Sequence, residues 1–256
     1  MIKAIINGCN GEMGQILARL IDSDKAIKVV AGIDRTPDKL CNTFPVYRDI
    51  FEFKENANII IDFSNPYHLP GLLDYVLERN LAMVIGTTGL SIQDMKYIKE
   101  VSEKTAIFYS DNMSLGLYTM ISIIKHITKA LSPLFDIEII EKYHNKKLDS
   151  PSHTAYMIVN EINETLGNCK EYVFGRYSKK ELRSENEIGI HSIRGGTIAG
   201  EHTILFAGYE EILEIKHTAI SKKAFALGAI NAAKLIADKK CGLYSMEDLI
   251  NISMQK

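Results

Sequence analysis

The sequence predicts an α/β protein in which a doubly wound parallel sheet is followed by a second, α+β domain with a mostly antiparallel, open sheet. Up to about residue 131, short apolar segments alternate with amphipathic helical patterns, as in successive βαβ units. After Pro133, strand-like segments of alternating polarity follow one another closely, for example over Ile188–Ile193, which indicates strands with one covered face. A last helical pattern over residues 222–237 suits an α/β layer better than the preceding sheet.

Composition restricts the class of protein. With 256 residues, 46% of them hydrophobic, the chain can bury one large core or two modest ones. Its formal net charge of -2 argues against a nucleic-acid partner bound by bulk electrostatics. No apolar run is long enough to cross a bilayer, and the segment before Asn7 is too short for a signal peptide. The cysteines are scattered without a C-x-x-C pair, which favours a reducing cytoplasm over disulfides or a zinc site: Cys9, Cys41, Cys169 and Cys241.

In the first part of the chain, each predicted strand leads into a predicted helix. The first helix shows one apolar face, formed by Ile16, Leu17, Leu20 and Ile21. The predicted strands are Ile2–Ile6, Ile27–Ile33, 58–64, Ala82–Ile85 and Ala106–Tyr109, and the later helices cover about 66–78, 91–103 and 115–131.

In the second part, one helix over Thr154–Leu166 is expected to cover the sheet. A sheet with a single covering helix keeps an apolar face that can meet another subunit. The predicted strands are Asp136–Tyr143, Glu171–Tyr177, Glu187–Ile193, His202–Phe206 and Glu211–His217, and a short capped helix over 244–250 ends the chain.

A glycine turn follows the first strand. Gly8, Gly11 and Gly14 enclose Glu12 and Met13, and Asp34 follows the second strand about 20 residues later, as a Rossmann-type dinucleotide site requires. The glycines let the backbone approach a pyrophosphate, and Asp34 can bind a ribose diol. Arg35 could clamp a 2′-phosphate that Asp34 would repel, so NADH and NADPH both remain compatible with the sequence. As alternatives, the glycines only make a tight turn and Arg35 is an ordinary turn residue.

Gly86, Thr87 and Thr88 end the fourth predicted strand. Ligands of open α/β sheets lie beyond the carboxyl ends of the strands, so these residues are placed to meet a cofactor. A plain turn at the end of a strand explains them equally well.

The loop over Glu141–Ala155 concentrates cations, imidazoles, a phenol and hydroxyls. Ser152 or Thr154 can cap the helix that follows, and the N-terminus of a helix attracts an anion. With Lys147 and His144 nearby, a carboxylate is the expected ligand. The alternative is a solvated basic surface loop.

With these motifs in place, the sequence resembles the 4-hydroxy-tetrahydrodipicolinate reductase (dihydrodipicolinate reductase) family of lysine and diaminopimelate synthesis. The resemblance covers essentially the whole chain. It rests on the turn Gly8–Gly14, on Asp62-Phe63-Ser64, Gly86-Thr87-Thr88-Gly89, Asn112-Met113-Ser114-Leu115-Gly116 and Arg194–Thr203, and above all on the loop at 141–155, which is similar to the signature E-x-H-H-x-x-K-x-D-A-P-S-G-T-A.

The resemblance implies hydride transfer from NADH or NADPH to a cyclic imine-type dicarboxylate. It implies that Lys147 donates the proton, that His144 contacts the substrate, and that Thr154 holds a substrate carboxylate. It adds Asn112 and Met113 to the cofactor site and implies a homotetramer built through the second sheet. The expected domains are residues 1–114 with 223–256 for the dinucleotide, and 115–222 for substrate and oligomerisation.

Three positions depart from the signature: Tyr143 replaces the histidine usually given the acid/base role, Ser150 an alanine, and His153 a glycine. A phenol is a poorer proton shuttle at neutral pH than an imidazole, although it can still donate a hydrogen bond or a proton. Our hypothesis is that Lys147 and His144 carry the chemistry and Tyr143 assists. His153 is strained if the backbone there needs a positive φ, and otherwise adds a cation beside the carboxylate site.

Two other functions remain compatible with the sequence. The departures could redirect the enzyme to another imine or keto dicarboxylate, or leave a catalytically silent nucleotide-binding paralogue. No metal site is expected, because the histidines show no ligand spacing such as H-E-x-x-H. The remaining histidines are interpreted as structural or exposed: His68, His126, His191, His202 and His217.

Overall fold

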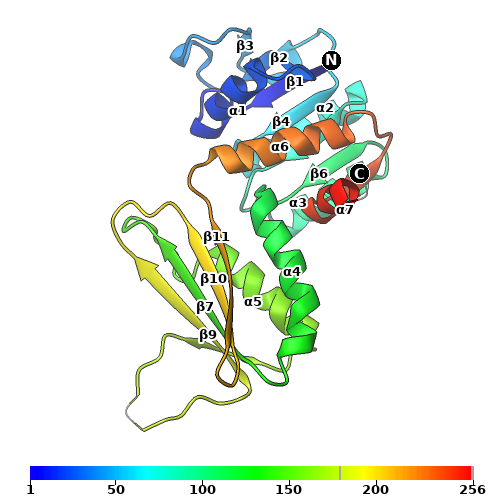
Figure 1. The fold of residues 1–256 in the computed structure, drawn as a ribbon. Helices are drawn as coiled ribbons and strands as arrows, with labels where there is room; N and C mark the ends of the chain where they lie inside the picture. Colours follow the sequence, from blue (N-terminus) through cyan, green and yellow to red (C-terminus); the bar gives the residue numbers. More distant parts are fainter. Residues whose placement is uncertain (179, 255–256) are drawn as a thin grey trace. The chain divides into compact units, whose positions relative to one another are not determined.

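The computed structural model describes residues 1–178 and 180–254, and the chain folds into two compact units. The first unit contains residues 1–115 and the chain from Lys222 onward, and the second contains Gly116–Ser221. The helices and strands of each unit are labelled in Figure 1. None of the helices in the described part of the chain is long and apolar enough to cross a membrane.

The first unit is built on a parallel, seven-stranded sheet with the order β12-β6-β5-β4-β1-β2-β3. The strands are β1 (Ile2–Asn7), β2 (Ile27–Ile33), β3 (Val46–Tyr47), β4 (Ile59–Asp62), β5 (Ala82–Ile85), β6 (Ala106–Tyr109) and β12 (Gly242–Tyr244). The helices are α1 (Glu12–Asp22), α2 (Leu69–Arg79), α3 (Ile92–Ser102), α6 (Lys223–Ile236) and α7 (Met246–Met254), with 3-10 turns η1 (Pro37–Lys39), η2 (Ile50–Glu52) and η3 (Pro66–His68).

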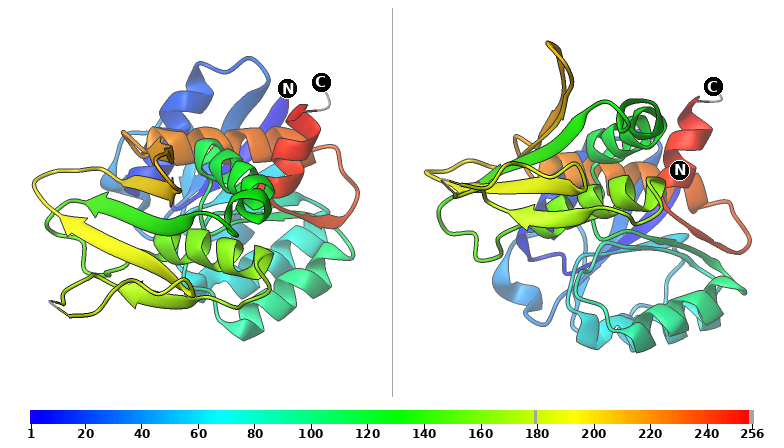
Figure 2. Two further views of the ribbon diagram at one scale, coloured as in Figure 1. Left: turned by 60° about the horizontal axis from the view of Figure 1, so that its bottom comes forward. Right: turned by 90° about the horizontal axis from the view of Figure 1, so that it is seen from below.

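Helices cover both faces of this sheet, which confirms the doubly wound architecture. Helix α6 packs against α1 and strands β4–β6, while α2 and α3 pack together on the other face, as Figure 2 shows for α6 in orange and for α2 and α3 in cyan and teal. The inner strands β4 and β5 are buried on both faces, with Ile59, Ile60 and Ile61 of β4 all fully buried. A buried sheet therefore positions the carboxyl ends of the strands, where open α/β sheets bind ligands.

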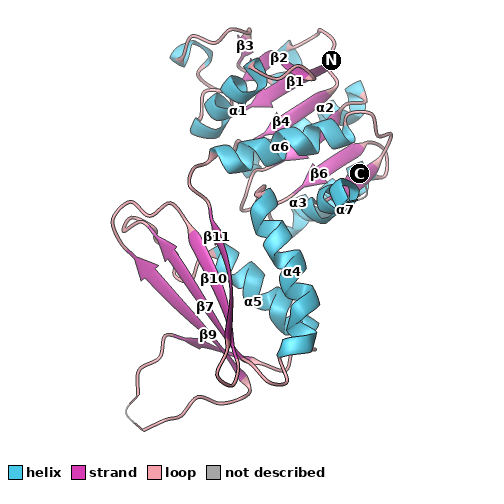
Figure 3. Cartoon of the chain, in the orientation of Figure 1, coloured by secondary structure: helices cyan, strands magenta, loops and turns pink. Residues whose placement is uncertain are grey.

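The second unit contains a five-stranded sheet with the order β11-β10-β7-β9-β8, whose strands Figure 3 shows in magenta. Its elements are α4 (Leu115–Leu131), β7 (Asp136–Tyr143), α5 (His153–Thr165), β8 (Glu171–Phe174), β9 (Glu187–Arg194), β10 (Glu201–Ala207) and β11 (Ile212–Thr218). The expectation of a mostly antiparallel sheet needs correction: β10 pairs antiparallel with β7 and β11, but β7, β9 and β8 run parallel. Alternating polarity reports which face of a strand is covered and carries no information on strand direction, so the pattern could not reveal the mixture.

The covering layer also differs from the expectation of a single helix. Leu117, Met120, Ile121 and Ile124 of α4 join Ile158, Val159 and Ile162 of α5 in one core with the inward side chains of the sheet. Two helices therefore cover the inner face. The outer face carries Glu138, Ile140 and Lys142 of β7, none of which is fully buried.

Candidate functional site

The glycine turn between β1 and α1 requires glycine for steric reasons. Gly8 has φ +78°, and a Cβ there would lie 2.6 Å from the carbonyl oxygen of Phe63. A Cβ on Gly14 would lie 2.6 Å from the Cα of Cys9 and closer still to the carbonyl oxygen of Gly8. Gly11 is the N-cap of α1 and offers no side chain to its first turn. The turn thus brings backbone close to the start of a helix, which is the arrangement that accepts a pyrophosphate.

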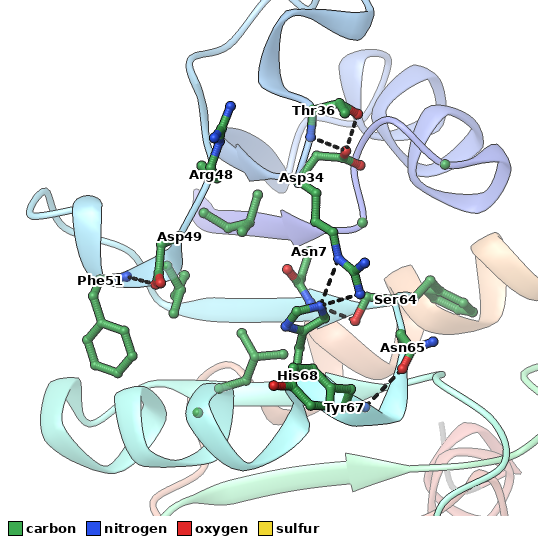
Figure 4. Close-up of a pocket in the computed structure, with 18 residues that line it drawn as sticks. Asn7, Asp34, Thr36, Arg48, Asp49, Phe51, Ser64, Asn65, Tyr67 and His68 are labelled. Carbon is green, nitrogen blue, oxygen red and sulfur yellow. Dashed lines mark hydrogen bonds between the residues drawn. The ribbon is translucent and has the colours of Figure 1, made fainter.

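A cavity of about 640 Å³ extends from this turn along the end of β2 to the start of α2. Asp34 lines it and is firmly oriented. Its carboxylate accepts hydrogen bonds from Thr36 N at 3.0 Å and Thr36 Oγ1 at 2.9 Å (Figure 4), and also from Asn10 N at 3.1 Å. An oriented carboxylate at the end of the second strand is suited to a ribose diol.

Arg35 also lines this cavity, and its side chain contacts a residue of another element. Its guanidinium reaches His68, which the sequence had suggested was structural or exposed; Nε and Nη2 lie 3.2 Å and 3.0 Å from His68 Nε2. The two residues are 33 positions apart, so no local pattern could have linked them.

A buried carboxylate joins the ends of three strands beside the glycine turn. Asp62, fully buried at the end of β4, accepts hydrogen bonds from Asn7 Nδ2 at 2.7 Å, Ser64 Oγ at 2.6 Å and Thr87 Oγ1 at 2.7 Å. Burial raises the pKa of Asp62, and these hydrogen bonds oppose that shift. Thr87 also accepts a hydrogen bond from Ser64 N at 2.9 Å. The Thr87 side chain therefore ties the ends of β4 and β5 together beside the glycine turn.

A second cavity of about 350 Å³ in the same unit shares Phe63 and Ser64 with the first. It brings together the other residues predicted at the strand ends: Met13, Gly86, Thr87, Thr88, Asn112 and Met113. Lys222, which the sequence did not single out, also lines it and forms an ion pair with Glu12. Of the predicted cofactor residues, Glu12 and Gly14 line neither cavity, and Gly14 lies buried beneath the turn.

The loop after β7 places Lys147 over the ring of Tyr143, with Nζ 4.5 Å from the ring centroid. The same Nζ lies 2.8 Å from Asp149 Oδ1, and this contact holds the pKa of Asp149 below its ordinary value. Arg194 approaches the Tyr143 ring at 5.5 Å from another strand. His144 is half-buried, and its carbonyl accepts the backbone N–H of Lys147 at 3.2 Å. Tyr143 and Lys147 are therefore in direct contact.

Arg194 is itself fixed by a buried partner. Its Nη2 lies 2.6 Å from Oε1 of Glu141, which is fully buried, and 2.6 Å from the carbonyl oxygen of Asp149. Although burial raises the pKa of Glu141, hydrogen bonds from neighbouring side chains, Arg194 among them, outweigh it and hold the value below the ordinary one. The Glu141–Arg194 pair thus ties the loop to the sheet.

Sequence reasoning missed the role of His202. This side chain is almost fully buried, with Nε2 3.4 Å from Tyr143 Oη and 3.3 Å from Ser152 Oγ. Burial lowers the pKa of His202 to about 4, so the imidazole is neutral at neutral pH. His202 pairs in register with Glu141 across β10 and β7, and only that register would have indicated its position.

The start of α5 answers the question raised by His153. Ser152 is the N-cap, and its Oγ accepts a hydrogen bond from Ala155 N at 3.1 Å. His153 is the first helical residue and is exposed, while Thr154 is buried. Among the described non-glycine residues, positive φ occurs at Asn80, Asn168 and Glu210, so His153 carries no such strain. The imidazole therefore adds a polar group to the helix N-terminus. In the described part of the chain, no group of three or more His, Cys, Asp or Glu side chains could hold a metal ion.

A Rossmann-type unit with a cavity beside its glycine turn, and a second unit with a cationic loop at a helix N-terminus, are typical of an NAD(P)H-dependent oxidoreductase for an anionic substrate. The family model described as dihydrodipicolinate reductase, N-terminus, matches residues 2–113, and its C-terminus model matches residues 116–250. The chain belongs to this family, the 4-hydroxy-tetrahydrodipicolinate reductases, which use NADH or NADPH in lysine biosynthesis. The resemblance noted in the sequence is thereby confirmed.

Named relatives agree along almost the whole chain. The 4-hydroxy-tetrahydrodipicolinate reductase of Caldanaerobacter subterraneus subsp. tengcongensis is 49% identical over 98% of both chains. That of Clostridium tetani is 42% identical over 98% of both. The structure of a dipicolinate-bound dihydrodipicolinate reductase from Paenisporosarcina sp. TG-14 matches with TM-score 0.83 at 24% identity, covering 97% of this chain and 99% of that one, and thus shares the fold.

Proposed function

We propose that this chain reduces 4-hydroxy-tetrahydrodipicolinate to tetrahydrodipicolinate with Lys147 as the proton donor. The first unit would hold NADH or NADPH, which supplies the hydride when bound, and the second unit would hold the substrate. The observation that carries the proposal is the Lys147 ammonium, in contact with Tyr143 and Asp149 just before the N-terminus of α5. Hydride addition leaves negative charge on the substrate, and an ammonium in reach can protonate it.

The substrate carboxylates would meet the first turn of α5. Thr154 lies in that turn behind the Ser152 cap, and the backbone N–H groups and the positive end of the helix dipole favour an anion. Asp149 already receives hydrogen bonds from Lys147 and from the backbone of His153. Asp149 would therefore occupy part of the anion site before substrate binds, and would release Lys147 toward the incoming carboxylate. His144 and His153 would add polar contacts at the rim.

Tyr143 would assist through a hydrogen bond rather than by shuttling protons. Burial raises the pKa of the Tyr143 phenol above its ordinary value, so the hydroxyl keeps its proton throughout the neutral range. Neutral His202 lies 3.4 Å from this hydroxyl and can orient it. A protonated phenol beneath Lys147 supplies a donor without adding negative charge to the site.

The deciding experiment follows the oxidation of NADH and NADPH in parallel with freshly generated 4-hydroxy-tetrahydrodipicolinate. Rapid oxidation with either cofactor is expected. Binding of both cofactors with no oxidation would contradict the proposal and favour the catalytically silent paralogue.

A second candidate substrate class is motivated by Tyr143 and His153, which replace a histidine and a glycine of the signature. Profiling other cyclic imine and keto dicarboxylates under the same conditions tests it. A higher kcat/KM for one of these than for 4-hydroxy-tetrahydrodipicolinate would reassign the substrate. Competitive inhibition by dipicolinate, the ligand of the Paenisporosarcina enzyme, would support the first assignment.

Three organisational features complete the proposal. Residues 1–114 with 223–256 would form the dinucleotide domain and 115–222 the substrate and oligomerisation domain, which the boundaries of the two compact units near residues 115 and 222 support. The chain would assemble as a homotetramer through the outer face of the second sheet. It would work in the cytoplasm, where its free cysteines, three of them exposed, stay reduced.

A further inference from the structure

A histidine that belongs to no motif faces the ribose end of the first cavity. His68 Nε2 meets both Nε and Nη2 of Arg35, at 3.2 Å and 3.0 Å, and both residues line the cavity together with Asp34 (Figure 4). We propose that His68 is a positioning residue that holds Arg35 ready for the 2′-phosphate of NADPH and thereby sets the discrimination between NADPH and NADH. The inference rests on the dinucleotide site of the proposed function.

The geometry of the guanidinium allows both contacts at once. A guanidinium carries five N–H donors in a planar fork with two usable edges. His68 takes the edge formed by Nε and Nη2. The other edge, formed by Nη1 and the second N–H of Nη2, presents the parallel donors that a phosphate accepts in a bidentate manner. The contact between Arg35 and His68 therefore leaves the other edge of the guanidinium available to the phosphate. It requires Nε2 to act as the acceptor, with the ring proton on Nδ1.

The charges around the cavity explain why this support matters. Asp34 faces the same space and repels a 2′-phosphate, so acceptance of NADPH depends on a cation that is already in place. Arg48 lines the far side, and the Asp49 carboxylate accepts a hydrogen bond from Phe51 N at 3.0 Å. An arginine side chain that is held by no neighbour loses conformational entropy when it binds a phosphate. Because His68 already restricts Arg35, most of that entropy is lost before the phosphate binds. NADH has no 2′-phosphate for Arg35 to bind, so its affinity depends little on the contact between Arg35 and His68.

The test measures the dissociation constants of NADPH and NADH for the full chain by titration calorimetry. His68→Ala is expected to lower the preference for NADPH over NADH by roughly tenfold. Arg35→Ala should lower the preference for NADPH over NADH by at least as much. The double variant with His68→Ala and Arg35→Ala should show the same preference as Arg35→Ala alone, because His68 acts through Arg35. His68→Gln should restore most of the preference, since its amide oxygen can accept from the guanidinium. His126→Ala, a matched substitution on α4, is the control and should leave the ratio unchanged.

Two results would overturn the inference. An unchanged NADPH-to-NADH ratio in His68→Ala, or equal weakening of both cofactors, would assign His68 a structural role only. Failure of the unmodified chain to bind either cofactor would instead overturn the proposed function, so the two failures are distinguishable.

Discussion

The Lys147 ammonium lies between the carboxylate of Asp149 and the face of the Tyr143 ring. Arg194, another cation near that ring, is held by Glu141, and a guanidinium is too weak an acid to replace a proton donor. We therefore predict that Lys147→Ala lowers kcat by about 10²- to 10⁴-fold, the usual contribution of a general acid. Cofactor dissociation constants should stay within about twofold, because the cofactor cavities belong to the other unit.

Lys146→Ala, which removes an exposed neighbouring lysine, is the matched control for this variant and should retain turnover. Unchanged turnover in Lys147→Ala would exclude its role as proton donor.

His202 makes stability depend on pH. Its pKa falls from 6.5 in the unfolded chain to about 4 in the folded one, so below pH 6.5 the unfolded state binds the extra proton and is favoured. The free energy of unfolding should therefore drop as the pH falls from about 6.5 to about 4, by about 3 kcal/mol in total from this group.

His202→Gln keeps a polar group near Ser152 and removes this titration. Urea unfolding at pH 7, 6 and 5 should show a flatter pH dependence in the variant than in the unmodified chain. The carboxylates, Asp62 among them, are the same in both proteins, so their contribution cancels when the two pH dependences are compared. Parallel curves for the two proteins would mean that folding does not lower the pKa of His202.

At the scale of elements, the glycine turn before α1 is the least tolerant segment of the first unit. A Cβ on Gly14 would lie 2.6 Å from the Cα of Cys9 and closer still to the carbonyl oxygen of Gly8, so backbone must shift. We predict that Gly14→Ala lowers the free energy of unfolding by about 1–3 kcal/mol and weakens the binding of both cofactors. Gly71→Ala in α2 meets nothing within 4 Å and should be neutral or stabilising by up to about 1 kcal/mol. Thermal unfolding of the two variants checks this contrast, and similar melting temperatures would contradict it.

Most elements could be predicted because their patterns are long enough to have a period. The expected bounds of the strands Ile27–Ile33, Ala82–Ile85 and Asp136–Tyr143 match those observed. Strands β3 and β12 were missed, since two or three residues show no alternation. The helix expected from Pro66 begins as the 3-10 turn η3 and becomes α2 at Leu69.

The candidate site was predictable only where its residues are neighbours in sequence. The glycine turn and the loop at 141–155 could be recognised because each motif lies within one short segment. His68, His202 and Arg194 escaped, because strand order and register bring them to Arg35, Tyr143 and Glu141 across 33, 59 and 53 positions. Pairing between strands brings these distant positions together, and a single sequence does not specify that pairing.

At the scale of the whole molecule, the division into units does not follow the order of the chain. The C-terminus family model spans residues 116–250, but from Lys222 onward the chain belongs to the first unit, where β12 pairs with β6 and α6 packs on the sheet. The second unit is thus inserted between parts of the first. The chain passes from the first unit to the second after Leu115 and returns at Lys222. Asn112 and Met113, just before the first passage, and Lys222 at the second all line the same cavity.

The outer face of the second sheet is suited to pairing with another copy of the chain. Its side chains mix apolar Ile140, Leu205 and Ile193 with a charge network in which Glu138 contacts Arg183 at 3.0 Å and His191 at 2.7 Å. Ile193 is 44% exposed although its strand lies inside the sheet, where an apolar side chain gains from being covered. If the tetramer forms here, light scattering should report about four times the 28.7 kDa of one chain.

Ile193→Glu tests this assembly without unfolding the unit. Ile193 lies in register with Lys142 on β7, so a glutamate there gains an opposite charge across the strands of a single chain. In a buried interface the same charge is costly, and we expect a smaller species with an unchanged circular dichroism spectrum. Ile92→Glu, on a 90% exposed residue at the start of α3, should leave the mass of the tetramer unaltered. A tetramer that survives Ile193→Glu would place the contact on another surface, and a monomeric unmodified chain would exclude the assembly.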